Sequence, residues 1–125
     1  MWMPQKGHRL SFLIIETEPS DGLSTRKLLL ESAKHNVITA YSGKEGIEMF
    51  KRFPNVDAIC IDAELNDLKS SNVAKKVKQT NPKIRIVGLT PRMAALCDWA
   101  DETIDSHDPA ALLKLLQEMG GRTDI

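Results

Sequence analysis

Apolar and polar residues alternate along the chain in short blocks, and the blocks predict five units of a strand followed by a helix. Most of the predicted strands are short apolar runs, a pattern typical of strands buried on both faces of a parallel sheet, and the fifth, over residues 102–104, is a weak strand signal. Between these runs, apolar positions recur at helical spacing. The runs predict strands over residues 10–15, 37–40, 58–61, 84–89 and 102–104. The helical spacing predicts helices over residues 20–34, 42–53, 92–99 and 108–119, and a further one between the loop through Lys69 and the turn at Asn81.

Residues that begin and end helices stand at the expected boundaries. Ser42 and Glu45 have the spacing of a capping box, in which side chain and backbone satisfy each other at a helix start. Asp108 followed by Pro109 predicts another helix start, since aspartate caps well and proline suits the first helical position. The glycines at 120–121 predict the end of that last helix.

The alternation of strands and helices indicates the class of fold. It predicts a flavodoxin-like (βα)5 fold, doubly wound, with a five-stranded parallel sheet and helices on both of its faces. The length of 125 residues suits one hydrophobic core. We expect one domain over residues 10–120, preceded by a tail over 1–9 and followed by a tail over 121–125.

Composition and charge narrow the choice of partner and compartment. The hydrophobic share of 42% and the charged share of 27% are ordinary for a globular protein. Seventeen basic residues balance seventeen acidic ones, so no direct binding of nucleic acid or membrane is expected. No stretch resembles a secretory signal or a bilayer-spanning helix. Cys60 and Cys97 suit reduced thiols in the cytoplasm, with a disulfide between them as the alternative.

Charge is distributed unevenly near the end of the chain. Residues 69–92 hold seven basic side chains and no acidic one, and residues 98–108 hold five acidic side chains and no basic one. One interpretation is a solvated helix face followed by acidic loops. The other is a bipolar surface used in docking, because complementary charge selects partners.

Carboxylates follow two of the predicted strands at their carboxyl ends. In open parallel sheets the functional crevice lies beyond these ends, so Glu16 and Asp62 are expected near each other, with Glu18 and Glu64 nearby. Oxygen-rich groups of this kind suit Mg²⁺. A carboxylate beside such a metal ion can attack a phosphoryl group, and Thr90 can contribute a hydroxyl.

Several stretches together resemble the receiver domain of response regulators in two-component signalling. The similarity spans about residues 10–119 in one register, so it depends on several motifs. The stretches that carry it are residues 12–19, 37–48, 56–62, 84–90 and 100–104.

The resemblance assigns roles to four positions. Asp62 is similar to the aspartate that accepts a phosphoryl group, and Thr90 to the residue whose hydroxyl engages that group during switching. Glu16 stands at the first acidic position of the family's metal site, and the backbone carbonyl of Glu64 at the position that completes it. The resemblance therefore implies Mg²⁺ as a cofactor, held by Glu16, Asp62 and the Glu64 carbonyl.

Five positions depart from the family pattern. Thr17 replaces the second acidic residue, which removes a negative charge from the implied metal shell. Ser106 replaces a lysine that pairs with phosphoryl oxygens, and His107 replaces the proline after it. Thr103 stands in place of an aromatic switch residue, and Pro91 in place of a small one. Loss of one preorganised charge partner typically costs about 100- to 1000-fold in rate.

Three functional hypotheses follow. The first is a phosphoacceptor receiver, in which phosphorylation of Asp62 shifts a partner-binding face. The alternative is a phosphorylation-incompetent pseudo-receiver that binds partners constitutively. The third is a flavodoxin-like enzyme or cofactor carrier, which the acidic turn after the first strand disfavours because it would repel phosphate.

The first two hypotheses imply a signalling domain and no enzymatic activity. The implied partners are a sensor histidine kinase or another signalling protein. A homodimer through the face of the fourth helix, fifth strand and fifth helix is the further expectation.

Overall fold

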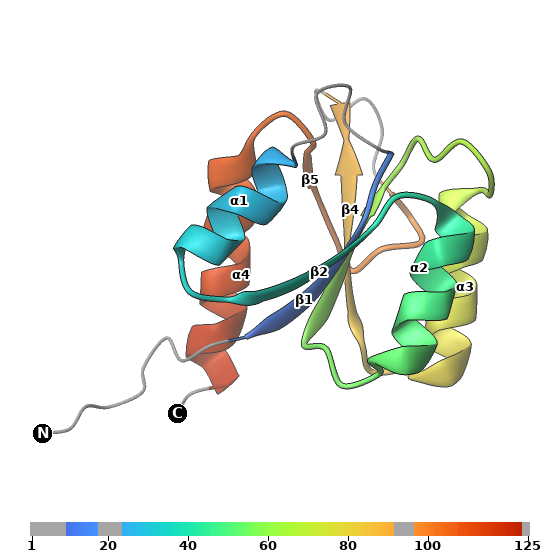
Figure 1. Ribbon diagram of the computed structural model, residues 1–125, viewed down its shortest axis with the longest axis horizontal. Coiled ribbons are helices and arrows are strands. Elements are labelled where there is room, and N and C mark those ends of the chain that lie inside the picture. Colours follow the sequence, from blue (N-terminus) through green and yellow to red (C-terminus); the bar gives the residue numbers. More distant parts are fainter. Residues whose placement is uncertain (1–9, 18–23, 92–96, 124–125) are drawn as a thin grey trace, which may run out of the picture.

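A parallel sheet forms the centre of the molecule. The computed structural model describes residues 10–17, 24–91 and 97–123 (Figure 1). Within this part of the chain, five strands pair in the order β2-β1-β3-β4-β5, and every pairing is parallel. The strands are β1 (Ser11–Ile15), β2 (Asn36–Ala40), β3 (Ala58–Asp62), β4 (Arg85–Thr90) and β5 (Glu102–Asp105). The predicted flavodoxin-like, doubly wound architecture is confirmed.

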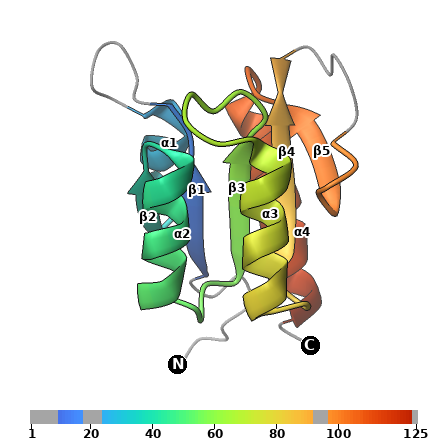
Figure 2. The ribbon, with the colours of Figure 1, turned by 90° about the vertical axis from the view of Figure 1, so that its right-hand side faces the viewer.

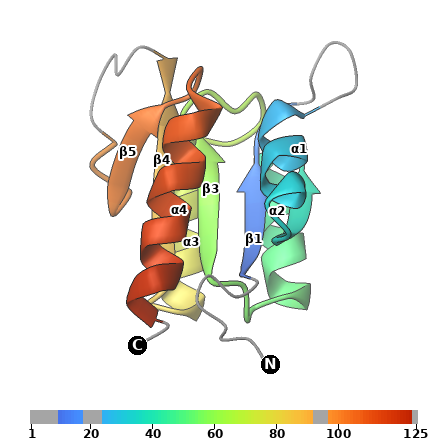
Figure 3. The same ribbon diagram turned by 90° about the vertical axis from the view of Figure 1, so that its left-hand side faces the viewer.

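Helices cover both faces of the sheet. Helices α2 and α3 lie side by side on one face, and α1 and α4 lie on the other (Figures 2 and 3). This arrangement is required because a parallel connection must cross over the sheet. The helices are α1 (Thr25–Ser32), α2 (Gly43–Arg52), α3 (Ser70–Thr80) and α4 (Pro109–Thr123).

Strand β1 shows why consecutive residues of an inner strand are apolar. Its side chains alternate between the two faces, with Leu13 and Ile15 packed in the core under α2 and α3. Phe12 and Ile14 pack in the second core, under α1 and α4. All four are at most 1% exposed. Burial of each such side chain stabilises the fold by about 1.5–3 kcal/mol.

Helix α1 begins later than the apolar spacing predicted. Residues 18–23, which include the first part of the predicted helix and its expected inward Leu23, lie outside the described residues. Ser24 is the N-cap, and its hydroxyl oxygen accepts a hydrogen bond from the Lys27 amide at 3.2 Å. The side chain of Leu30 is fully buried, as its predicted inward position requires.

The end of α1 is closed by a residue in a left-handed conformation. Lys34 has a φ of 72°, which favours glycine. The amide of Lys34 donates to the carbonyl of Glu31 at 2.9 Å, and the amide of His35 donates to that of Leu30 at 3.1 Å. These two bonds form a Schellman motif, so the geometry of the turn forces a lysine into a conformation that is costly for it.

The start of α2 differs in one detail from the predicted capping box. The Ser42 hydroxyl accepts from the Glu45 amide at 3.0 Å, as expected. The Glu45 carboxylate, however, accepts from the amide of Tyr41 at 2.7 Å and not from that of Ser42. The glutamate therefore reaches one residue further back, and it fixes the end of β2 against the helix.

Helix α4 confirms its predicted beginning, while its predicted end is wrong. Asp108 accepts a hydrogen bond from the Ala111 amide at 3.1 Å, and Pro109 is the first helical residue. The helix continues through the glycines at 120–121 to Thr123. Glycine only lowers helix stability, by about 1 kcal/mol each, and it ends a helix only where the backbone turns left-handed. The predicted inward side chains of Leu116 and Met119 lie outside the described part of the chain.

The short helix predicted over residues 92–99 falls mostly outside the described residues. Its described end, residues 97–99, is a turn in which the Ala100 amide donates to the Cys97 carbonyl at 3.0 Å. The side chain of Cys97 is buried, and both cysteines are free thiols. The alternative of a disulfide between Cys60 and Cys97 is therefore wrong.

Candidate functional site

The carboxyl ends of the strands meet at one edge of the sheet, where the candidate residues follow. Ile15 of β1 pairs with Ile61 of β3, so Glu16 and Asp62 are the next residues on neighbouring strands. Thr90 is the last residue of β4, the next strand along. The topology therefore brings the backbones of Glu16, Asp62 and Thr90 to the same edge, as predicted.

Asp62 is half-buried at the end of β3 and is held in a tight turn. One of its carboxylate oxygens accepts a hydrogen bond from the amide of Glu64 at 2.8 Å. Its carbonyl accepts from the hydroxyl of Ser70, the first residue of α3, at 2.5 Å. The side chain of Glu64 is exposed. These bonds fix the loop after β3 and leave the second carboxylate oxygen of Asp62 available to a ligand.

Glu16 is a buried carboxylate that is already paired with a cation. It is 2% exposed, and its Oε1 atom lies 2.5 Å from Nη1 of Arg26, in the first turn of α1. The other terminal nitrogen of Arg26, Nη2, donates to the carbonyl of Ser106 at 2.7 Å. One guanidinium thus joins the end of β1, helix α1 and the segment that follows β5.

The surroundings of this ion pair are dry. The second carboxylate oxygen of Glu16, Oε2, is buried and has no hydrogen-bond partner among the described residues. Burial raises the pKa of the neighbouring Cys60 thiol to about 12, while the charge of Arg26 lowers it and that of Glu16 raises it. A buried charge without a partner is costly, so the guanidinium of Arg26 compensates the buried carboxylate of Glu16.

Thr90 and Ser106 are neighbours across the last two strands. Both are buried, and the Ser106 amide donates to the Thr90 carbonyl at 3.0 Å. Thr103, at the position of an aromatic switch residue, accepts a hydrogen bond from the Cys97 amide at 3.0 Å. His107 is exposed. Ser106 therefore stands beside Thr90, where the resemblance expects a lysine, and it brings a hydroxyl group in place of a charge.

The donor set fits a resident Mg²⁺ poorly. Within the described residues, no group of three or more acidic, histidine or cysteine side chains could hold a metal ion. One oxygen of Glu16 binds Arg26, and Thr17 contributes no charge. Glu18 lies outside the described residues. Mg²⁺ requires near-octahedral oxygen ligands and dehydrates reluctantly, so a single half-buried carboxylate at Asp62 is a weak site.

The loop between β3 and α3 is fixed by an acidic residue that the sequence did not single out. The carboxylate of Asp67 accepts hydrogen bonds from the amides of Gly43 at 2.8 Å and Lys44 at 2.9 Å, at the start of α2. These backbone hydrogen bonds hold the pKa of Asp67 below its usual value, and the bond from the Lys44 amide has the largest effect. The loop beside Asp62 is thus anchored on the neighbouring helix.

A cleft of about 530 Å³ lies against this loop and reaches the turn before β5. It combines apolar and polar side chains, and one of them, Leu68, is an exposed large hydrophobic residue. The described residues that line it are Ala63, Leu65, Asn66, Asp67, Leu68, Lys69, Ser70, Ser71, Asp98 and Trp99. A partner seated at this end of the sheet would contact the loop that carries Asp62.

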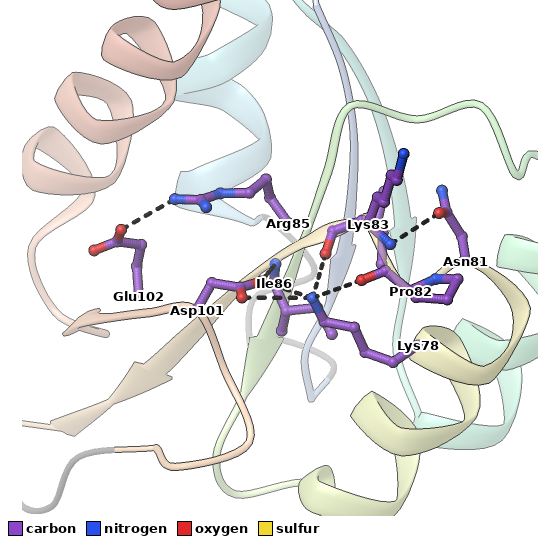
Figure 4. A network of polar contacts seen from close by, with 9 residues as sticks. Lys78, Asn81, Pro82, Lys83, Arg85, Ile86, Asp101 and Glu102 are labelled. Carbon is purple, nitrogen blue, oxygen red and sulfur yellow. Dashed lines mark hydrogen bonds and ion pairs between the residues drawn. The ribbon is translucent and has the colours of Figure 1, made fainter.

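The basic and acidic segments noted in the sequence form two ion pairs with each other at the surface. The Lys78 ammonium lies 3.1 Å from a carboxylate oxygen of Asp101 and 2.7 Å from the Ile84 carbonyl (Figure 4). Arg85 lies 3.1 Å from Glu102, within the same network. Two basic and two acidic side chains of the suggested bipolar docking surface are therefore already paired with each other near the start of β5.

Arg26 is the site residue that sequence reasoning missed. One signal was present, because a basic residue in the first turn of a helix is electrostatically unfavourable unless an anion lies close by. The first turn of α1 holds no acidic residue that could compensate for it. The partner of Arg26 is instead Glu16, on a different element.

Comparison with known proteins supports the fold. No protein-family model and no curated protein matches the chain at a significant level. Its structure resembles a response regulator receiver domain protein from Clostridium thermocellum, with a TM-score of 0.77 and 23% identity. The alignment covers 91% of this chain and 95% of that one.

Two further solved structures give the same result. A CheY-like receiver domain protein from Methanospirillum hungatei JF-1 has a TM-score of 0.76 at 20% identity, over 91% of this chain and 95% of that one. The response regulator TrrA from Thermotoga maritima, solved in complex with Mg²⁺-BeF, has a TM-score of 0.69 at 23% identity, over 88% and 98%. The chain therefore has the CheY-like receiver fold. No helix within the described residues has the length and apolar character needed to span a bilayer.

Proposed function

We propose that this chain is a receiver-type signalling domain that acts by binding a partner protein, without metal-dependent phosphorylation of Asp62. The observation that carries this proposal is the buried Ser106 beside Thr90, at the position where receivers place a cationic lysine. A hydroxyl group cannot neutralise the charge that develops on a transferring phosphoryl group.

The guanidinium of Arg26 does not replace the missing lysine. Both terminal nitrogens of Arg26 are engaged, one by Glu16 and the other by the Ser106 carbonyl. Loss of one preorganised charge partner slows such a transfer by about 100- to 1000-fold. The poor metal donor set adds a second loss, so Asp62 is expected to be a structural residue of the loop and not an efficient nucleophile.

A second candidate is the phosphoacceptor receiver, with Asp62 as the acceptor and Thr90 as the switch hydroxyl. It is favoured by the half-buried carboxylate of Asp62 at the end of β3, one strand away from Thr90. In this candidate function Mg²⁺ would be held by Glu16, Asp62 and the Glu64 carbonyl.

The expected partners are the same for both candidates. They are a sensor histidine kinase or another signalling protein, or a second copy of the chain that pairs through β5 and the helices beside it. Balanced charge disfavours direct binding of nucleic acid or membrane. We expect no enzymatic turnover and a cytoplasmic location.

Intact-mass measurement separates the two candidates. Wild type and Asp62→Asn are incubated with Mg²⁺ and a small-molecule phosphodonor, next to a receiver domain that accepts phosphate from the same donor. The proposal expects no mass gain in either form of this chain. Gain of one phosphoryl group by wild type alone would contradict it and establish the phosphoacceptor function.

A further inference from the structure

The guanidinium of Arg26 lies at the carboxyl end of β1, where it pairs with the buried carboxylate of Glu16. Arg26 bonds to Glu16 and to the carbonyl of Ser106, 80 residues further along the chain. Its side chain is 18% exposed, and that of Glu16 is 3% exposed. Arginine remains protonated at every pH at which the protein is folded, so this cation is permanent.

The position of the pair within the sheet gives it significance. Glu16 directly follows Ile15, whose partner Ile61 directly precedes Asp62. The carboxylate held by Arg26 therefore belongs to the residue that neighbours Asp62 on the adjacent strand, at the edge of the sheet where a metal ion would need anionic ligands. We infer that Arg26 is a tethered cation that replaces a divalent metal ion at Glu16, and that its removal opens a divalent-cation site at Glu16 and Asp62.

A free metal ion competes poorly with this arrangement. The guanidinium is attached to the same chain, so its effective concentration at Glu16 is on the order of millimolar or higher. A metal ion would have to displace it and lose water on entering a buried site. Once Arg26 is removed, neither oxygen of Glu16 has a partner among the described residues, because Oε2 already lacks one there. A buried, uncompensated carboxylate then favours the entry of a cation.

The inference concerns the same edge of the sheet as the proposed function and rests on its premise that no metal ion resides there. It is tested with Mn²⁺, which broadens the NMR amide signals of residues near its binding site. Wild type is expected to keep the signals of residues 15–17 and 61–64. Arg26→Gln is expected to lose them, with an affinity for Mn²⁺ at least about tenfold above that of wild type.

Matched variants isolate the contact. Lys27→Gln removes the same charge from the next position, where the ammonium pairs with the exposed Glu31, and it is expected to behave as wild type. Adding Glu16→Gln to Arg26→Gln is expected to abolish the gain. Arg26→Met removes the cation while keeping an aliphatic side chain, and it replaces Arg26→Gln if that variant does not fold.

Two outcomes overturn the inference. One is site-specific broadening in wild type, and the other is its absence in a folded variant without Arg26. The two proposals also fail separately. Phosphoryl gain by wild type in the presence of Mg²⁺, without site-specific Mn²⁺ broadening, would contradict the proposed function and leave the tethered cation in place. Mn²⁺ binding to wild type without any phosphoryl gain would contradict the tethered cation and leave the proposed function in place.

Discussion

The buried carboxylate of Glu16 forms an ion pair with the partly buried guanidinium of Arg26, and the two side chains are 3% and 18% exposed. Breaking a buried pair by removing one partner is costly, because the other charge stays buried. Replacing both partners by apolar side chains removes that cost. Stability measurements on this pair therefore depend on whether one charge or both are removed.

Arg26→Met is expected to lower the free energy of unfolding by about 3 kcal/mol. The double variant Glu16→Met with Arg26→Met should recover most of this loss and come within about 1 kcal/mol of wild type. Urea denaturation of the four members of the cycle provides the measurement. A double variant as unstable as the sum of the single ones would show that the two side chains act independently.

Lys78 is expected to contribute to stability through its contacts with the residues that directly precede β4 and β5. Its ammonium binds the Ile84 carbonyl and the Asp101 carboxylate, so Lys78→Met should destabilise the protein by about 1–2 kcal/mol. Lys76→Met is the control, because Lys76 is exposed on the same helix and should change stability by less than about 0.5 kcal/mol. Equal effects of the two changes in thermal denaturation would argue against the network.

The stability of the protein should depend on pH through the ionisation of Asp67. Its pKa is lower in the folded protein than its usual value of 3.8, so its stabilising contribution is complete above that value. The contribution is lost as the pH falls through the folded pKa. The stability difference between wild type and Asp67→Asn should therefore be constant near neutral pH and shrink below about pH 4. A difference that stays unchanged in acid would exclude the carboxylate as the anchor of the loop.

Lys34→Gly is expected to stabilise the protein. Glycine adopts the left-handed conformation of this turn without strain, so the free energy of unfolding should rise by about 1 kcal/mol. For a domain of this size the melting temperature would rise by about 4 °C. Lys76→Gly, in the middle of α3, should have the opposite effect because glycine weakens a helix interior. Stabilisation by both changes would point to the loss of a lysine charge as the cause.

The sequence predicted the fold well because the inner strands lie between two helical layers. Phe12 and Ile14 face one core and Leu13 and Ile15 the other, so the strand had to be apolar throughout. An apolar run of this kind can be recognised from consecutive residues, because any strand between two helical layers needs it. The predicted end of α4 was wrong because glycine at 120–121 weakens a helix without necessarily ending it.

The candidate site was predicted only in part. The positions of Asp62 and Thr90 follow from where their strands end, which the sequence shows directly. The contact between Arg26 and Ser106 joins residues 80 positions apart, and no local pattern encodes such a distance. The same guanidinium pairs with Glu16, and this pair became visible only with the three-dimensional structure.

The same distance along the chain has a consequence for how the domain assembles. The guanidinium of Arg26 can reach the carbonyl of Ser106 only after β5 has joined the sheet, and closing so long a loop carries a large entropic cost. We therefore expect the contact to form after the rate-limiting step of folding. Its loss should leave the folding rate almost unchanged and accelerate unfolding, so that Arg26 governs how long the native state persists once it has formed.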